Sequence, residues 1–150
     1  KVGTKVKFFK NSIHVRGPEK IKSIRNITTK EYPGFPTDLA PQFMVLLCKA
    51  SGTSSITENI FQGRFLHAME LQRLGAKITI KNRTAKIEGN TNFIAAEVMS
   101  SDLRASAALV LAGIVSKGNT VVTRVYHCDR GYENFENKLK KIGVKIKRLK

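Results

Sequence analysis

Two stretches of the chain carry apolar residues at the same helical spacing. The apolar positions are Leu39, Phe43, Leu46, Leu47 and Ala50 in the first stretch, and Leu103, Ala107, Val110, Leu111 and Ile114 in the second. Each set lies on one face of a predicted α-helix that begins just after a Thr-Asp or Ser-Asp pair. A glycine turn and a β-rich run follow each helix, at residues 54–60 and 119–126. A second helix then ends at Gly75 or Gly143, where glycine is a natural cap before a strand.

Alternating apolar and polar residues predict two β-hairpins. One spans residues 77–89 around a Lys-Asn-Arg turn, and the other spans residues 5–17 around Lys-Asn-Ser. Together the elements predict an α/β fold built from βαβαββ repeats. We expect residues 1–18 to close a preceding unit, residues 19–90 to form one complete unit, and residues 91–150 to form a second unit that lacks its last strand. Because the chain starts inside a repeat and without methionine, we expect it to be the carboxy-terminal portion of a longer protein.

Composition supports one folded domain and excludes several classes of protein. The chain has 150 residues, of which 41% are hydrophobic and 25% charged, so disorder and low-complexity repeats are excluded. No stretch has the apolar length of a membrane span or of a secretory signal, so we expect a cytoplasmic protein without a membrane partner. The two cysteines, Cys48 and Cys128, are far apart and lack neighbouring ligands, so neither a disulfide framework nor a metal site is expected.

The formal net charge of +16 favours anionic partners. The basic residues are scattered along the chain, however, and no RNA- or DNA-binding motif accompanies them. Two interpretations of the charge stay open, a basic RNA-binding module and a lysine-rich bias of the coding genome.

Four segments carry a family resemblance. They are Tyr32–Asp38 (YPGFPTD), Glu58–Phe65 (ENIFQGRF), Asp102–Gly113 (DLRASAALVLAG) and Tyr126–Glu133 (YHCDRGYE). In this order and spacing they closely resemble the bacterial UDP-N-acetylglucosamine 1-carboxyvinyltransferases, and the resemblance covers the last third of that family's length. It implies an inside-out α/β barrel of βαβαββ units, three in each of two domains, with the helices inside and the sheets outside.

The resemblance also implies an activity. These enzymes transfer the enolpyruvyl group of phosphoenolpyruvate to the 3-hydroxyl of UDP-N-acetylglucosamine and release phosphate, without a cofactor. The reaction is the first committed step of peptidoglycan synthesis, which links it to cell wall biogenesis, cell shape, the cell cycle and cell division. The family's reactive cysteine loop, its amino-terminal Lys-Asn pair and further arginines lie outside this chain. We therefore expect the missing amino-terminal portion to be a partner, and the chain alone to have no turnover.

Six residues match the family's site. The resemblance implies substrate binding by Asp38, Ile60, Arg64, Asp102, Arg104 and Arg130, with Asp38 and Arg130 also catalytic. Guanidinium groups suit a substrate that carries a phosphate and a carboxylate, because they are always charged and can donate two parallel hydrogen bonds. Asp38 matches the residue that contacts the sugar, where a carboxylate can act as the general base. Ile60 matches a backbone contact to the nucleotide sugar.

Some of these candidate site residues also have a simpler possible role. Asp38 and Asp102 each precede a helix, so either could be an N-cap worth about 1 kcal/mol. Arg64 and Arg130 could be solvated loop residues. The His127-Cys128 pair suggests a nucleophile, but no acid or oxyanion-stabilising group accompanies it.

Three other functions stay open. The shikimate-pathway enzyme 3-phosphoshikimate 1-carboxyvinyltransferase belongs to the same superfamily, although the motifs argue against it. An RNA-binding module would leave those motifs unexplained. A degenerate remnant is disfavoured because the site residues are intact.

Overall fold

Short strands and helices alternate in a mixed α/β arrangement. The computed structural model describes residues 2–149. The strands are β1 (Lys5–Phe8), β2 (Ile13–Arg16), β3 (Ile27–Thr28), β4 (Thr53–Thr57), β5 (Lys77–Lys81), β6 (Thr84–Glu88), β7 (Glu97–Met99) and β8 (Val121–Thr123). The helices are the 3-10 helix η1 (Thr37–Leu39), α1 (Ala40–Cys48), α2 (Leu66–Arg73), α3 (Leu103–Ile114), α4 (Tyr126–Asp129) and α5 (Phe135–Lys141). None of the described helices is long and apolar enough to cross a membrane.

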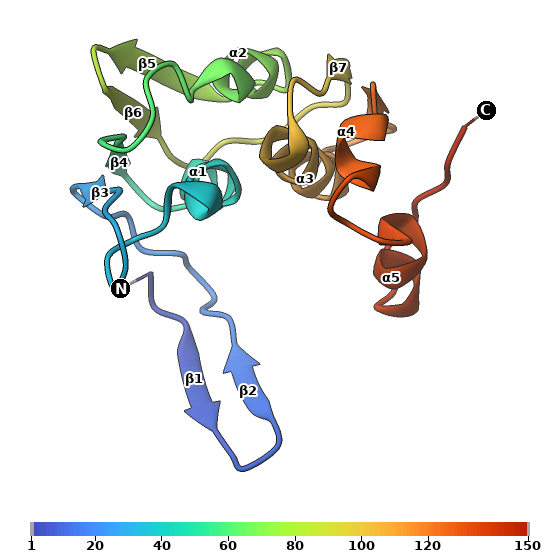
Figure 1. Ribbon diagram of the computed structural model, residues 1–150, viewed down its shortest axis with the longest axis horizontal. Coiled ribbons are helices and arrows are strands. Elements are labelled where there is room, and N and C mark those ends of the chain that lie inside the picture. Colours follow the sequence, from blue (N-terminus) through green and yellow to red (C-terminus); the bar gives the residue numbers. More distant parts are fainter. Residues whose placement is uncertain (1, 150) are drawn as a thin grey trace.

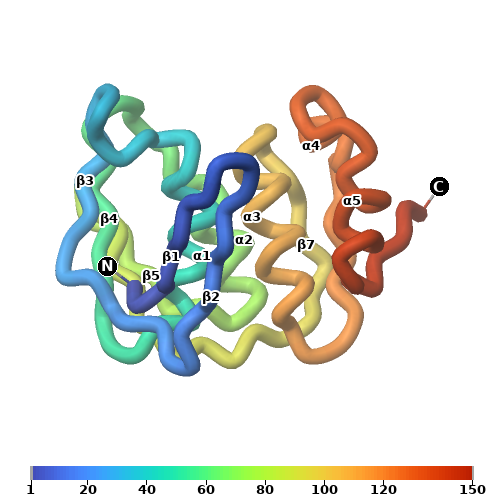
Figure 2. The backbone as a smooth tube through the Cα atoms, turned by 90° about the horizontal axis from the view of Figure 1, so that it is seen from below, coloured from blue at the N-terminus to red at the C-terminus, as the bar shows by residue number. Residues whose placement is uncertain are grey.

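The strands form three sheets. A four-stranded sheet has the order β3-β4-β6-β5, β1 pairs with β2, and β7 pairs in parallel with β8. Figures 1 and 2 place β3 and β4 at one end of the molecule and α4 and α5 at the other, with α1 and α3 between them. The middle of the molecule thus brings together segments from both halves of the chain.

The core lies where α1, α2 and α3 meet the four-stranded sheet. Its fully buried members include Met44 and Leu47 of α1, Ile56 and Ile87 of the sheet, and Leu71 of α2. The buried residues of helix α3 are mostly small, so it packs closely on α1. They are Ala105, Ser106, Ala107, Ala108, Leu109 and Ala112. The apolar residues that set the helical spacing in the sequence behave differently, since Leu111 and Ile114 remain partly exposed.

The structure confirms several sequence expectations. The hairpin at residues 77–89 forms as β5 and β6, with Ile78 paired to Ile87. The hairpin at residues 5–17 forms as β1 and β2. Gly143 ends α5 with φ +92°, the left-handed conformation expected of a helix cap.

Two expectations about the last sixty residues are wrong. The helix expected before Gly143 forms as α5, but Ile142 at its end, which the apolar spacing places on the inner side, is 76% exposed. No strand follows α5 in the described part of the chain, so this region lacks both strands of a final hairpin rather than one. The physical reason is the absence of a neighbouring strand there, and Arg148 instead ties this segment to Asp129 and Glu136.

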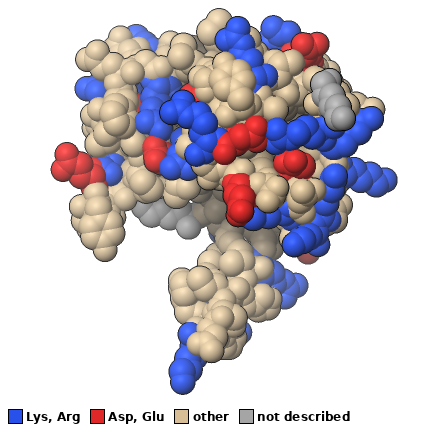
Figure 3. All heavy atoms as spheres, turned by 45° about the vertical axis from the view of Figure 1, so that its right-hand side comes forward, with Lys and Arg blue, Asp and Glu red and all other residues tan. Residues whose placement is uncertain are grey.

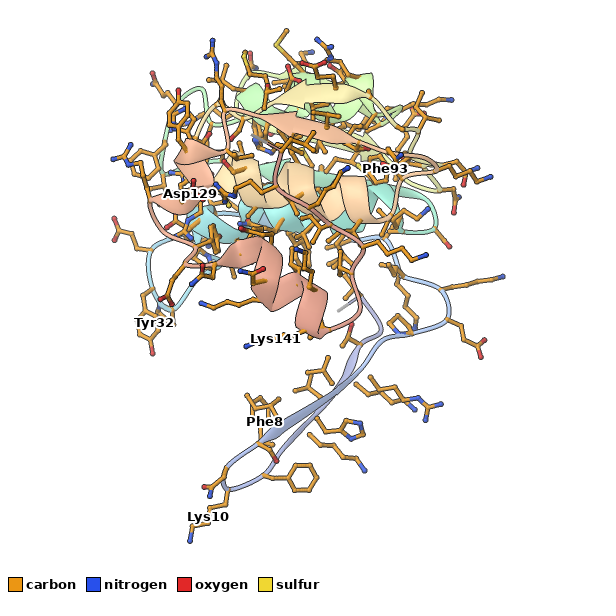
Figure 4. The ribbon with its side chains drawn as sticks, turned by 90° about the vertical axis from the view of Figure 1, so that its right-hand side faces the viewer. Phe8, Lys10, Tyr32, Phe93, Asp129 and Lys141 are labelled. Carbon is orange, nitrogen blue, oxygen red and sulfur yellow. The ribbon has the colours of Figure 1, made fainter. Side chains whose placement is uncertain are left out.

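The β1–β2 hairpin extends away from the body of the molecule (Figures 1 and 4). Its register puts Val6 opposite Val15 and Phe8 opposite Ile13, so these four apolar side chains share one face. The other face carries Lys5, Lys7, His14 and Arg16. All eight residues are exposed, so the hairpin adds little to the core.

Candidate functional site

Asp38 forms ion pairs with Arg64 and Arg104 at the centre of the candidate site. Arg64 Nη2 donates to Asp38 Oδ1 at 2.6 Å, and Arg104 Nη2 donates to Asp38 Oδ2 at 2.8 Å. The three side chains come from η1, from the loop before α2 and from the first turn of α3. They keep 48%, 24% and 32% of their surface exposed for Asp38, Arg64 and Arg104 respectively, so a ligand can reach them. Two cations facing one anion leave one positive charge in excess, which suits an anionic ligand.

The arginines keep the Asp38 carboxyl ionised. Burial alone would raise the pKa of this carboxyl, but the hydrogen bonds and positive charges of Arg104 and Arg64 outweigh it, so the pKa is lowered. In this state Asp38 is a poor acceptor of a proton.

Glu58 holds the segments of Asp38 and Arg64 together, although no role for it was predicted from the sequence. It is 2% exposed, and its carboxylate accepts hydrogen bonds from four donors. The donors are Thr29 Oγ1 at 2.8 Å, Thr37 Oγ1 at 2.7 Å, the Ile60 amide at 2.7 Å and the Phe61 amide at 3.1 Å. Thr37 precedes Asp38 and the two amides begin the loop that leads to Arg64. Glu58 therefore fixes the distance between η1 and that loop.

Ile60 and Arg64 lie on this loop. The Ile60 amide is taken by Glu58, so a ligand contact to its backbone would use the carbonyl oxygen. The Arg64 guanidinium lies 5.0 Å from the centre of the Phe61 ring, a cation–π contact that further restrains it.

Asp102 is the N-cap of α3. Its Oδ1 accepts from the amides of Arg104 at 2.8 Å and Ala105 at 2.9 Å, and its backbone is extended as in other N-caps. Burial would raise the pKa of this carboxyl, but these amides and Ser101 lower it. Of the two aspartates that the sequence presented as possible caps, only Asp102 caps, since Asp38 lies inside η1 and makes no cap hydrogen bond.

Arg130 does not belong to the Asp38 contact but lines a pocket beside the start of α3. A pocket of about 370 Å³ is lined by Ser101, Asp102, Leu103, His127 and Arg130. Arg64 and Arg130 each follow the last residue of a strand, Thr57 or Thr123, by seven positions, as expected for equivalent places in a repeat. Arg130 itself is at the end of α4 and is exposed, whereas Arg64 is held by Asp38.

The His127-Cys128 pair has no features of a nucleophile. Cys128 is buried, and burial raises the pKa of its thiol to about 11. A thiol rather than a thiolate is therefore present at neutral pH. Among residues 2–149, no group of three or more His, Cys, Asp or Glu side chains could hold a metal ion.

His67 is a buried residue of α2, three positions after Arg64. It is 2% exposed, and the charges of Asp102 and Arg64 act on it. Burial lowers its pKa from 6.5 to about 4, so the buried ring is neutral at physiological pH. Nε2 has no partner among the described residues.

His67 should make stability depend on pH. Its pKa in the folded state is below the unfolded value, so the unfolded state binds the proton first and stability falls as the pH decreases. Between about pH 7.5 and about pH 5 the loss should be about 2 kcal/mol, measured by urea unfolding at each pH. A His67→Leu variant should lose this dependence and a His14→Leu variant should keep it. An equal loss in wild type and His67→Leu would contradict the assignment.

Basic side chains are spread over the surface of the molecule. Figure 3 shows Lys and Arg spread over several parts of the visible face, with Asp and Glu among them. The charge therefore forms a broad positive field, which favours the approach of anionic molecules in general.

A comparison with known families decides the assignment. The model of the EPSP synthase family, described as EPSP synthase (3-phosphoshikimate 1-carboxyvinyltransferase), matches residues 1–139. The chain belongs to this family. Within the EPSP synthase family, the chain is 58% identical over 149 residues to the UDP-N-acetylglucosamine 1-carboxyvinyltransferase of Pelagibacter ubique and 51% identical to that of Helicobacter pylori. These matches cover 99% of the chain but only 36% and 35% of the relatives, so the chain spans about a third of their length.

Solved structures of the EPSP synthase family share the fold. The enolpyruvyl transferase NikO from Streptomyces tendae has a TM-score of 0.89 at 26% identity, over 97% of this chain and 34% of its own. EPSP synthase from Acinetobacter baumannii, at 18% identity and a TM-score of 0.69, shows the fold alone and covers 99% of this chain and 35% of its own. The fold of these neighbours is an inside-out α/β barrel, which agrees with the expected fold class, whereas the division into repeats stays a prediction.

Proposed function

We propose that this chain is the carboxy-terminal portion of an enzyme that transfers the enolpyruvyl group of phosphoenolpyruvate to the 3-hydroxyl of UDP-N-acetylglucosamine. The relatives at 58% and 51% identity are UDP-N-acetylglucosamine 1-carboxyvinyltransferases, which supports this substrate pair. The observation that carries the proposal for this chain is the Arg64–Asp38–Arg104 contact. It places guanidinium groups that can bind an anion next to a carboxylate that can accept a proton from a hydroxyl group, and all three side chains are partly exposed.

Each site residue then has a role in addition followed by elimination. Arg64, Arg104 and Arg130 bind the phosphate and carboxylate of phosphoenolpyruvate. The sugar 3-hydroxyl oxygen forms a bond to C2 of phosphoenolpyruvate and gives its proton to Asp38, while C3 takes a proton from a group outside this chain. Loss of a proton from C3 and of phosphate from C2 then gives the enolpyruvyl product. Asp102 orients Arg104 through its cap, and Ile60 contacts the nucleotide sugar through its backbone.

Asp38 becomes an effective base only when the arginines have another partner. In the ligand-free molecule both guanidinium groups bind its carboxylate and lower its pKa. An anionic substrate that takes over Arg64 and Arg104 weakens these contacts and raises the pKa of Asp38 toward its usual range. Substrate binding and base activation are thereby coupled.

The wider assignment follows from the same proposal. Residues 1–18 would close a preceding unit, residues 19–90 would form a full βαβαββ unit, and residues 91–150 would begin another. The enzyme would work in the cytoplasm in peptidoglycan synthesis, and so support cell shape and division.

Binding of the nucleotide sugar tests the proposal directly. UDP-N-acetylglucosamine is titrated into the ¹⁵N-labelled chain at moderate salt, which suppresses nonspecific charge effects. Saturable shifts of the amides near Asp38, Ile60 and Arg64 are expected. Shikimate 3-phosphate should not reproduce them, an Arg64→Gln variant should weaken them, and a variant of the exposed Arg25, Arg25→Gln, should keep them. Shifts with shikimate 3-phosphate alone would favour the shikimate-pathway enzyme instead.

The chain by itself should have no turnover. Closure of two domains over the substrates is needed in such enzymes, and the relatives are about three times as long as the part matched here. Phosphate release is measured with both substrates present. Release that disappears in an Asp38→Ala variant would contradict this expectation.

A further inference from the structure

Tyr132 has no role in the site described so far, yet it contacts one of its arginines. It lies in the connection between α4 and α5, two residues after Arg130. Its hydroxyl oxygen accepts a hydrogen bond from Arg104 Nη1 at 3.1 Å, and Gln42 Nε2 approaches the same oxygen at 3.5 Å. Because a guanidinium group can only donate, the direction of the first bond is certain.

These contacts make Arg104 part of a closed ring with Asp38, Tyr132 and Gln42. Its two terminal nitrogens have different partners, Asp38 on Nη2 and Tyr132 on Nη1. Asp38 and Gln42 are four positions apart where η1 leads into α1, so the ring returns to its starting segment. Two partners from two segments restrain both the position and the plane of the guanidinium.

Tyr132 is itself held firmly. Its amide donates to the carbonyl of Cys128 at 2.9 Å, and its ring lies 4.9 Å from the ring of Phe135. The preceding Gly131 packs against the start of α3, where a Cβ would come within 2.8 Å of Leu103 Cδ2. The turn that contains Arg130 and Tyr132 therefore packs against α3, the helix that contains Arg104.

The two partners of Arg104 differ in charge. Asp38 neutralises part of the positive charge, whereas the tyrosine hydroxyl accepts a hydrogen bond without neutralising any. The Tyr132 contact even raises the pKa of Arg104. An oriented guanidinium with its charge intact is the better anion ligand, because less rotational freedom is lost when the ligand binds.

We propose that Tyr132 is a positioning residue for Arg104, whose hydroxyl holds the guanidinium in the plane in which it receives an anionic substrate, and which ties Arg104 to the turn that carries Arg130. The identification of that anion as phosphoenolpyruvate rests on the proposed function. The orientation of Arg104 does not, since it is a property of the ligand-free chain.

The test uses Tyr132→Phe, which keeps the ring and removes only the hydroxyl. The matched control is Tyr32→Phe, since Tyr32 is 98% exposed. Arginine side chains of the chain are labelled with ¹⁵N, and the signals are assigned with Arg64→Lys and Arg104→Lys variants. In Tyr132→Phe, rotation of the Arg104 guanidinium about its Nε–Cζ bond should become faster while Arg64 is unchanged. The dissociation constant for phosphoenolpyruvate should rise roughly threefold to tenfold, the effect of one hydrogen bond.

Each outcome has a defined meaning. Faster rotation at Arg104 alone, with an unchanged melting temperature and weaker phosphoenolpyruvate binding, supports the proposal. Equal rotation of Arg104 in wild type and Tyr132→Phe overturns it, as does equal loosening of both arginines, which would mean that Tyr132 acts only on stability. If the wild-type chain does not bind phosphoenolpyruvate at all, the proposed function fails for this chain, and the rotation of Arg104 still decides the role of Tyr132.

Discussion

Replacing Asp38 with asparagine is expected to lower kcat of the full-length transferase by roughly 10²- to 10⁴-fold, the usual contribution of a general base. The same change should tighten the binding of phosphoenolpyruvate to this chain by severalfold. Both effects have one cause, because Asp38 binds Arg64 and Arg104 in the absence of substrate and therefore competes with an incoming anion. The amide keeps the shape of the carboxylate but carries no charge, so the arginines are released and the base is lost.

Two measurements separate these effects. The turnover number is measured in the full-length enzyme at saturating substrate, and binding is measured by calorimetry on the chain itself. Glu133→Gln is the matched control, since it removes one negative charge from an exposed residue that pairs with Lys138 and not with the site arginines. If Glu133→Gln tightens binding as much as Asp38→Asn, the gain comes from net charge and not from the released arginines.

Replacing Glu58 with alanine is expected to destabilise the chain by about 3 kcal/mol. The substitution leaves the Thr29 and Thr37 hydroxyls and the amides of Ile60 and Phe61 without their acceptor. Each unsatisfied donor that stays buried costs about 1–3 kcal/mol, and the loop relaxes to recover part of this. The loss should also widen the distance between η1 and Arg64, and so weaken the binding of anions.

Urea unfolding at neutral pH measures the change in the free energy of unfolding. Glu88→Ala is the control, since Glu88 is an exposed residue at the end of β6. It should change stability by no more than about 0.5 kcal/mol, as is usual for surface positions. A Glu58→Ala variant as stable as Glu88→Ala would mean that the four hydrogen bonds contribute no net stability.

The two aspartates show how much of the site local sequence can specify. Asp38 and Asp102 both precede a helix, and their contexts look alike. The residue three positions after Asp102 is Ala105, whose amide donates to the carboxylate, whereas the residue three positions after Asp38 is Pro41, which has no N–H. The difference in capping was therefore present in the sequence as a single proline.

The contacts between distant segments could not be found in the same way. Asp38 meets Arg104 only because α1 packs on α3, and the small residues that make this packing close say nothing about which polar groups will face each other. Resemblance to a family supplied Asp38, Arg64 and Arg104 as site residues, but not their mutual contact. Glu58 was missed for a related reason, since a carboxylate in a polar loop normally faces water and its burial depends on four donors that only the fold assembles.

The strand expected after Gly143 does not form within residues 2–149, and this too has a physical reason. Val144 and Ile146 alternate with lysines as a strand would, but a strand is stable only when a neighbour accepts and donates its backbone hydrogen bonds. Lys77–Lys81 has the same alternation and does form a strand, because β6 lies beside it.

The β1–β2 hairpin should be the part of the isolated chain that proteases cut first. Trypsin cuts after Lys and Arg, and the hairpin presents Lys5, Lys7, Lys10 and Arg16 on a projecting segment (Figure 4). A two-stranded hairpin without a packed face is only marginally stable in water, so it opens readily for a protease. Val2 is buried, and its carbonyl accepts from the Lys22 amide, so the hairpin is anchored at both ends. The first cuts should therefore nick the chain within the hairpin and leave the body that carries the site intact.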